Sequence, residues 1–347
     1  MHFTPQTLRQ LRRFRHLRRG WWSFLALTAL TVLALVGELV VNNRALVVRY
    51  QGQWHFPTYG AQLTGNAFGL GYDYEPDYRE LQRQFRTAGS GDFVLLPPVP
   101  YSPNEIDVPA GAKPTRPPGW ESRHYLGTDT IGRDILARLF YGFRVALVVS
   151  LSFLTGTYLL GIALGCAMGW FGGWFDLAMQ RIIEAWSNLP FLLIVMIISA
   201  ALRPTQPVLI TVFIAFSWMA MTYYMRTGVY REKAREYVAA AEVLGASPAR
   251  IIFRHILPNL LSTLITFVPF TIAGAIELLT ALDFLGFGIP PPTPSWGELL
   301  RQGTQNLNAP WIVTSAFGAL VLVLLLVSFV GEAIREAFDP KKFTYYQ

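Results

Sequence analysis

The sequence is short of the residues from which most disulfide, metal and nucleotide sites are built. Among its 347 residues Cys166 is the only cysteine, and it lies within an apolar run. An internal disulfide and a cysteine-based metal cluster are therefore excluded. The four lysines stand at 113, 233, 341 and 342, and none precedes Ser or Thr after a glycine-rich loop. The chain thus carries no phosphate-binding P-loop, and if ATP drives its activity another polypeptide must hydrolyse it.

Signatures of intramembrane enzymes are missing as well. The chain has no His-Glu-x-x-His pair and no Gly-x-Ser-x-Gly turn. Its histidines, at positions 2, 16, 55, 124 and 255, are scattered outside the apolar runs. The sequence therefore predicts that the protein is not an enzyme.

Charge is scarce throughout the chain. Only 15% of the residues are charged and 52% are hydrophobic, which favours a membrane protein over a soluble domain. The net charge of +7 comes from basic residues at the ends of apolar runs and in one central loop. This distribution is typical of membrane topology and argues against a nucleic-acid-binding face.

Six apolar stretches are long enough to cross a bilayer, which requires about 20 residues in a helix. They cover residues 21–41, 142–171, 177–202, 206–227, 257–281 and 311–331. The first stretch follows six arginines as a signal peptide would, but its apolar run is too long and no small-x-small cleavage site follows. We therefore expect an all-α integral membrane protein with six transmembrane helices, the first of them retained.

The distribution of basic residues predicts the orientation of these helices. Residues 1–20 contain no acid, which places the N-terminus in the cytoplasm by the positive-inside rule. The basic central loop and tail then fall on the same side. The expected divisions are a cytoplasmic basic N-terminus at 1–20, helix one at 21–41, a periplasmic insertion with an interfacial helix at 42–141, a five-helix core at 142–331 with a cytoplasmic loop at 228–258, and a cytoplasmic tail at 332–347.

The long insertion has two parts of different composition. Residues 42–90 mix Tyr, Trp and Gly with balanced charge and indicate a small strand-rich or loop-rich cap, whereas residues 91–118 hold eight prolines and favour extended chain. One interpretation is a poorly ordered linker, and the other is a docking surface for an external partner. The sequence leaves both open.

Residues 126–142 precede the second apolar stretch and alternate in helical periodicity. Apolar residues recur at three- and four-residue spacing, while Arg133, Asp134 and Arg138 occupy the other side. The pattern predicts a helix lying on the membrane surface, in which Asp134 and Arg138 pair across one turn.

Two further patterns predict local packing and a helix start. Gly161, Gly165, Gly169 and Gly173 recur every four residues, a spacing that forms a groove for close helix packing in lipid. In the last outer loop Ser295 stands three residues before Glu298 as a capping box, so a short helix beginning at Trp296 is expected near the pore mouth.

The cytoplasmic loop 228–258 is rich in helix-forming residues. Gly245 is a natural helix stop, and Ser247-Pro248 is an N-cap followed by proline at the first helical position. We expect two short helices joined at Gly245. Its apolar residues, Val243, Leu244, Ile251 and Ile252, are expected to give this corner a surface that a partner covers.

This loop resembles the EAA loop of ABC importer permeases, and the chain around it resembles the C-type subunit of the oligopeptide, dipeptide and nickel permease family. The matching segments are 124–134, 236–247, 254–259, 284–288 with 294–297, and Asp339-Pro340. The resemblance covers residues 120–347 closely and 1–41 loosely. The large 42–118 insertion is most similar to that of the Yej-type peptide importers, the branch linked to microcin C uptake.

The loop departs from the family pattern at two positions. The glutamate slot, counted back from Gly245, holds Ala239, and Glu236 and Glu242 lie one turn either side. The slot of a later isoleucine holds His255. The departures leave open which acid contacts the ATPase.

The resemblance implies the fold of an ABC type I importer permease and a set of partners. These are a second homologous permease, two ATP-binding-cassette ATPase subunits or domains, a periplasmic solute-binding protein and membrane lipid. It implies no cofactor in this chain, because ATP is bound by the partner subunits, and a bacterial inner membrane location. The residues it assigns to ATPase coupling are Glu236, Ala239, Ala240, Ala241, Glu242, Gly245, Ser247, Arg250, Arg254 and Pro258.

Glu277, near the outer end of the fifth apolar stretch, is the candidate for the transport pathway, because acids within a membrane are functional candidates by default. The alternative function is a stand-alone secondary transporter or channel. Such proteins tend to show inverted repeats, broken helices or several buried charges. The sequence shows none of these clearly, and that reading leaves the EAA-like loop unexplained.

Overall fold

The computed structural model describes residues 5–89, 91–202 and 204–338. The closing Asp339-Pro340 and the lysines at 341 and 342 lie outside these residues. The helices are α1 (Pro5–His16), α2 (Arg18–Leu35), α3 (Tyr78–Ala88), α4 (Ile135–Phe171), α5 (Gly173–Ser187), α6 (Phe191–Ala201), α7 (Gln206–Lys233), α8 (Glu236–Val243), α9 (Pro248–Ile251), α10 (Leu257–Leu285), α11 (Trp296–Gln305) and α12 (Pro310–Phe338). Three strands, β1 (Val47–Tyr50), β2 (Gln53–His55) and β3 (Phe93–Leu95), and the short helices η1 (Gly37–Leu39), η2 (Gly65–Phe68) and η3 (Ile252–Ile256) complete the elements.

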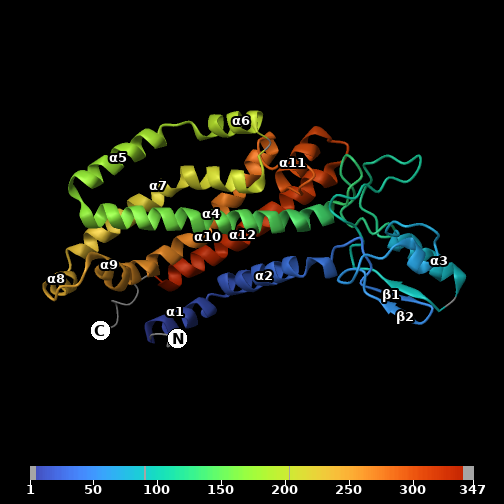
Figure 1. Cartoon of the computed structure of the whole chain (residues 1–347), viewed down its shortest axis with the longest axis horizontal. Coiled ribbons are helices and arrows are strands. Elements are labelled where there is room, and N and C mark those ends of the chain that lie inside the picture. The colour runs from blue at the N-terminus through green and yellow to red at the C-terminus, as the bar shows by residue number, and fades with distance from the viewer. Residues whose placement is uncertain (1–4, 90, 203, 339–347) are drawn as a thin grey trace.

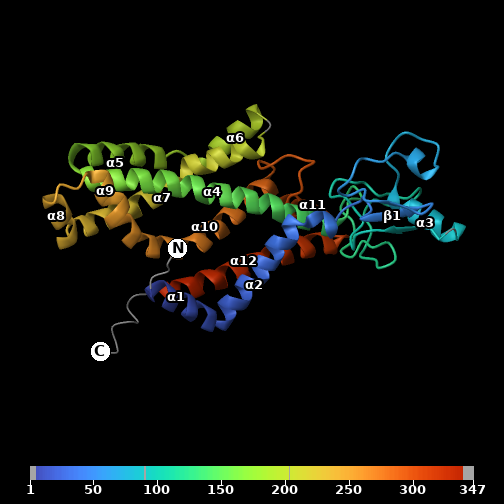
Figure 2. The same cartoon turned by 60° about the horizontal axis from the view of Figure 1, so that its bottom comes forward.

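The molecule is an elongated bundle with different structures at its two ends. Figure 1 shows the long helices running side by side along the long axis, with the strands and α3 at one end and α8 and α9 at the other. Helix α4 packs against α7 and α10, α10 packs against α12, and α12 packs against α2. Figure 2 shows α1 and α2 alongside α12, on the side of the bundle away from α5.

Glycines hold α4 and α7 in close contact. A Cβ atom added at Gly161 would lie 2.6 Å from the Met221 Cβ, and one at Gly165 would lie 2.5 Å from the Thr222 carbonyl oxygen. Gly169 meets α7 in the same way at Val229. The predicted groove is therefore confirmed for three of its glycines. Gly173 is the exception, because α4 ends at Phe171 and Gly173 begins the next helix, where no atom of the described chain lies within 4 Å of an added Cβ.

Within the described residues, four helical spans are long and apolar enough to cross a membrane: α4, α7, α10 with the turns leading into it, and α12. The expected helix at 177–202 is broken into α5 and α6, which bend by 65° and make a fifth span if counted together. Pro190 lies at the break. It accounts for the break because proline disfavours helix in the residue before it and has no N–H to donate. The expected first span becomes α2, which ends at Leu35 and is not among the spans that pass this test. The six-helix count therefore stays a prediction.

The insertion folds into a small domain, so the interpretation as a poorly ordered linker is wrong. Strand β1 pairs antiparallel with both β2 and β3. Helix α3 packs on this sheet through Tyr78, Leu81 and Phe85, which are buried. Helix α3 was not predicted, although the Asp77 cap and the Gly89 stop mark its ends. The two ends of the domain meet where Val41 pairs with Val99.

The expected interfacial helix at 126–142 is wrong. Residues 126–134 are not helical, and α4 begins at Ile135 with Asp134 as its N-cap, whose side chain accepts a hydrogen bond from the Ala137 N–H. The polar side of the pattern faces buried partners, because Arg133 and Arg138 are 4% and 0% exposed. Asp134 does not pair with Arg138 but caps the helix.

Candidate functional site

The expected corner of two short helices lies at the end of the bundle opposite the inserted domain (Figure 1). Helix α8 follows α7 after two residues, and its Val238 is buried in one apolar cluster with Trp170, Val229 and Ile256. At the end of α7 the Lys233 ammonium donates to the Trp170 carbonyl oxygen at 2.7 Å. The corner is thus fixed to the ends of α4 and α7.

The turn between α8 and α9 follows the prediction. Gly245 adopts a left-handed conformation with φ of 76°, which favours glycine. The Ser247 hydroxyl then accepts a hydrogen bond from the Arg250 N–H, and Pro248 occupies the first position of α9. The chain therefore reverses within four residues, from Leu244 to Ser247.

The residues expected to couple to an ATPase lie together on the outer surface of this corner. Glu236, Ala239, Ala240, Glu242, Gly245, Ser247, Arg250, Arg254 and Pro258 are exposed, and Ala241 is half-buried. Val243 and Leu244 are 88% and 86% exposed and form an apolar tip. The expectation is wrong for Ile251 and Ile252, which are buried and anchor the corner to α10.

The π-helix η3, which joins α9 to α10 over Ile252–Ile256, was not predicted either. Single π-helical turns are rare and are frequently found at functional sites. His255, which stands where the family pattern has an isoleucine, lies in this turn. Nothing in the residue pattern distinguishes such a turn from an ordinary helix.

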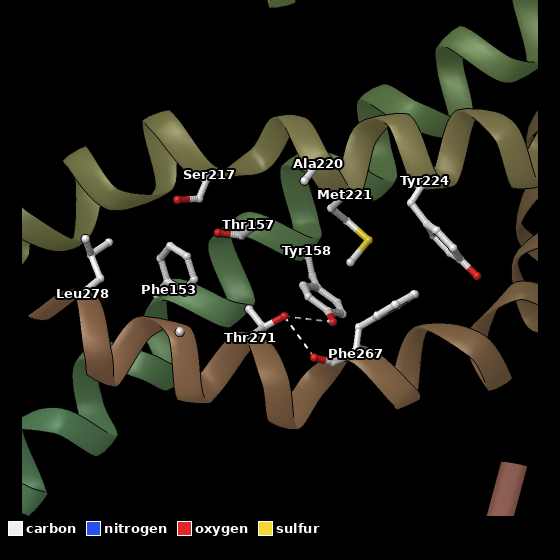
Figure 3. Close-up of a pocket in the computed structure, with 11 residues that line it drawn as sticks. Phe153, Thr157, Tyr158, Ser217, Ala220, Met221, Tyr224, Phe267, Thr271 and Leu278 are labelled. Carbon is white, nitrogen blue, oxygen red and sulfur yellow. Dashed lines mark hydrogen bonds between the residues drawn. The ribbon is translucent and has the colours of Figure 1, made fainter. Parts of the chain in front are cut away.

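A cavity of about 590 Å³ opens between α4, α7 and α10 in the membrane-spanning part of the chain. Its lining residues are Phe153, Thr157, Tyr158, Ser217, Ala220, Met221, Tyr224, Phe267, Thr271, Gly274 and Leu278. Figure 3 shows the Tyr158 hydroxyl close to Thr271, and these two oxygens are 3.5 Å apart. The Thr157 hydroxyl is buried and has no hydrogen-bond partner among the described residues. The cavity thus combines aromatic walls with hydroxyl groups and has no carboxylate or basic side chain among its described lining.

Glu277 lies on α10 beside this cavity but does not line it. It follows the lining residue Gly274 by three positions, and its side chain is exposed on the bundle surface. Its role in a pathway stays a prediction.

A cluster of buried charges joins the start of α4 to α11. The Arg133 guanidinium donates to Asp129 at 2.7 Å and to Glu298 at 2.9 Å, and Arg138 also donates to Glu298. Glu298 lies in the first turn of α11, in the predicted capping box, where the Ser295 hydroxyl accepts from the Glu298 N–H. The Trp296 indole N–H donates to the Leu139 carbonyl oxygen at 2.9 Å. These contacts fix α11 against α4.

His124 ties the inserted domain to the same helix. Its Nδ1 lies 2.7 Å from an oxygen of Asp134, and its Nε2 lies 2.9 Å from an oxygen of Asp107. Burial opposes the charged form, but the hydrogen bonds to Asp107 and Asp134 outweigh it and raise the pKa of His124. Carboxylates only accept hydrogen bonds, so the two contacts favour the protonated imidazole, whereas the Arg116 guanidinium, 3.0 Å from Nε2, opposes it. The hydrogen bond with His124 in turn holds the pKa of Asp107 below its usual range.

No group of three or more His, Cys, Asp or Glu side chains able to hold a metal ion is found in ranges 5–89, 91–202 and 204–338.

The sequence matches the family described as the binding-protein-dependent transport system inner membrane component over residues 161–344. It is 38% identical to the inner membrane ABC transporter permease protein YejE of Escherichia coli (strain K12), over 95% of this chain and 96% of that protein. It is equally 38% identical to the peptidoglycan transport system permease protein YejE of Agrobacterium fabrum, over 98% and 94%. The oligopeptide transport system permease protein OppC of Escherichia coli is 32% identical over 72% of this chain.

We predict that Glu298→Gln destabilises the protein strongly. The change leaves the buried Arg133 and Arg138 with Asp129 as their remaining carboxylate, and an uncompensated buried charge costs about 3–5 kcal/mol. Thermal unfolding of the purified protein in detergent measures the loss. The matched control is Glu184→Gln, since the Arg181–Glu184 pair is exposed and exposed pairs contribute about 0–1 kcal/mol. Equal unfolding temperatures for the two variants would contradict a stabilising role of the buried cluster.

Proposed function

The chain belongs to the family of binding-protein-dependent transport system inner membrane components, and from that premise we propose that it is the transmembrane permease subunit of an ATP-binding-cassette importer for peptides. The observation that carries the proposal is likeness to peptide-importer permeases over nearly the whole chain. The exposed two-helix corner agrees with it, since a subunit without a P-loop needs a surface through which another protein drives it.

The complete importer contains further subunits. We expect a second homologous permease, two ATP-binding-cassette subunits or domains that bind ATP, and a periplasmic solute-binding protein. In this arrangement the corner and both termini face the cytoplasm, and the inserted domain faces the periplasm. The separation of the corner and the inserted domain at opposite ends of the bundle supports this orientation (Figures 1 and 2).

Copurification tests the subunit assignment. The chain is tagged, solubilised gently from native membranes, and its bound proteins are identified by mass spectrometry. We expect a P-loop ATPase and a second permease, because this chain lacks an ATP site of its own. Recovery of the chain alone, with solute transport intact in vesicles without ATP, would favour the secondary transporter instead.

Coupling rests on the rigidity of the corner. We propose that α8 and α9 insert into a cleft of one ATPase subunit, which buries Val243 and Leu244, while Arg250 and Arg254 pair with its acids. Closure of the ATPase dimer would then move the corner as a rigid body. Lys233 and the buried Val238 would pass this movement to α7 and α4. Glu236 and Glu242 are both exposed, so either acid can reach the ATPase.

Gly245→Val should uncouple ATP hydrolysis from transport. A β-branched residue is disfavoured at the left-handed φ of 76°, a conformation that costs residues other than glycine about 1–2 kcal/mol. The turn should open and move the apolar tip. We expect peptide uptake by the reconstituted importer to fall at least about fivefold while ATP hydrolysis persists. A change of about fivefold is the lower end of the range that coupling between two sites usually produces.

The control is Gly245→Asn, since asparagine tolerates the left-handed conformation and should retain most uptake. No atom of the described residues lies within 4 Å of a Cβ added at Gly245, so a steric clash among them does not explain a loss. Full uptake by Gly245→Val would refute the role of this turn.

The cavity between α4, α7 and α10 supplies the part of the pathway that this chain contributes. We propose that peptides pass along it, because its hydroxyl groups can bond main-chain amides while its aromatic walls accept apolar side chains. The second permease would line the opposite side.

Gly274→Leu should block this path. Among the residues that the structure describes, the added side chain meets no atom within 4 Å at its Cβ, and it extends into the cavity, so it narrows the path without disturbing the helix contacts. We expect peptide uptake to fall about tenfold, the usual effect of one misplaced apolar group in a pocket, with assembly unchanged. Gly318→Leu on α12 is matched, since it also has open space but lies outside the cavity. If both variants transport alike, the cavity is not the path.

A further inference from the structure

A second cleft, of about 380 Å³, lies in the inserted domain and has a different character from the cavity in the membrane. It runs between α3, the proline-rich segment and the loop before His124. Four arginines, Arg79, Arg83, Arg86 and Arg123, are among its lining residues. Arg79, Arg83 and Arg86 are four and three positions apart, so α3 presents them on one face.

The arginines of the cleft differ in whether their charge is already paired. Arg79 bonds to Asp77 and Glu105, and Arg83 pairs with Glu80 at 3.0 Å. The guanidinium groups of Arg86 and Arg123 make no hydrogen bond or ion pair with any residue that the structure describes. The Nη1 atom of Arg79 is buried and also lacks a partner within the described chain. A buried donor that makes no hydrogen bond lowers the stability of the fold, so a ligand that accepts a hydrogen bond from this Nη1 would stabilise it.

Three acids also line the cleft, and the carboxylates of two of them already pair with basic side chains of this chain. Asp77 bonds to Arg79, and Asp107 bonds to His124 and Arg116. Glu121 is exposed and is the one lining acid with no ion-pair partner among the described residues. Two unpaired guanidinium groups therefore face one unpaired carboxylate, and the cleft favours an anion.

The loop that carries Arg123 is held in place. Arg123 has a φ of 58°, which is unusual for a residue other than glycine. The Gly119 N–H donates to the His124 carbonyl oxygen at 2.9 Å, and the Tyr101 hydroxyl donates to the Ser122 carbonyl oxygen. The next residue, His124, bonds to Asp134 at the start of α4. The cleft is thus pre-formed and attached directly to the bundle.

We propose that this cleft is the docking site for acidic side chains of the solute-binding protein. The inference rests on the proposed function, which puts the inserted domain outside the membrane at the end where such a protein arrives. Arginine forks match carboxylates in bidentate geometry, and the exposed Arg83 extends the positive face of α3 beyond the cleft. Attachment to α4 through His124 would set the bound protein at a fixed place above the bundle.

The test measures binding of the solute-binding protein to the complete importer in nanodiscs, at low and high ionic strength. Arg86→Glu and Arg123→Asn should each weaken binding about five- to tenfold at low ionic strength, with smaller effects at high ionic strength. Asparagine is chosen at 123 because it tolerates the left-handed backbone. Arg49→Glu is the matched control, because Arg49 is exposed on β1 of the same domain and is not among the cleft residues.

Glu121→Gln separates docking from a purely structural effect. Removing the competing carboxylate should tighten binding about two- to threefold, and a misfolded domain does not gain affinity. Unchanged binding in Arg86→Glu and Arg123→Asn, or an equal loss in Arg49→Glu, overturns the proposal and leaves the permease function standing. Absence of any binding to the wild-type importer overturns both.

The remaining outcome concerns free peptide. If the cleft variants bind the solute-binding protein normally but lose uptake of peptides with a free C-terminal carboxylate, relative to amidated peptides, the cleft binds cargo and the docking proposal is wrong.

Discussion

The close contact between α4 and α7 is the interaction on which the rest of the bundle depends. Helices in lipid gain little from apolar burial alone, because acyl chains are as apolar as leucine, so small residues must let backbones approach. Gly161, Gly165 and Gly169 do this along one face of α4, at distances where no Cβ would fit beside Met225 or Val229. Since α8 follows α7 after two residues, the same contact fixes the position of the corner that α8 and α9 form.

Helix α4 also joins the two ends of the molecule. Its first turn holds Arg138 against Glu298, and Asp134 at its N-cap holds His124 of the inserted domain. Its last turn offers the Trp170 carbonyl oxygen to Lys233, next to the corner. One uninterrupted helix of 37 residues therefore connects the inserted domain to the corner.

Local chemistry was predictable from sequence where a residue acts on its own neighbours. The Gly245 stop, the Ser247 cap and the start of α11 at Trp296 follow from the backbone preferences of single residues, and all three are observed. The surroundings of Arg138 were not predictable in this way. Helical periodicity puts its side chain opposite the apolar face. It cannot tell whether that polar side faces water or a buried partner such as Glu298, which lies 160 positions away in the chain. Pro190 signals the break between α5 and α6, but the length of the apolar run around it favoured one continuous helix. The Asp77 cap signals α3, but the composition of residues 42–90 favoured strands and loops.

Buried and exposed apolar residues have different roles at the corner. Helix α8 has eight residues and α9 has four, and helices this short are not stable by themselves in water. Their order comes from Val238, Ile251 and Ile256, which are fully buried against the ends of α4 and α7. Val243 and Leu244 are not part of this buried cluster, and each side chain is more than four-fifths exposed. Full burial of such a side chain contributes about 1.5–3 kcal/mol. The inner residues thus hold the corner in place, and the two outer ones would contribute free energy of this size if another protein covered them.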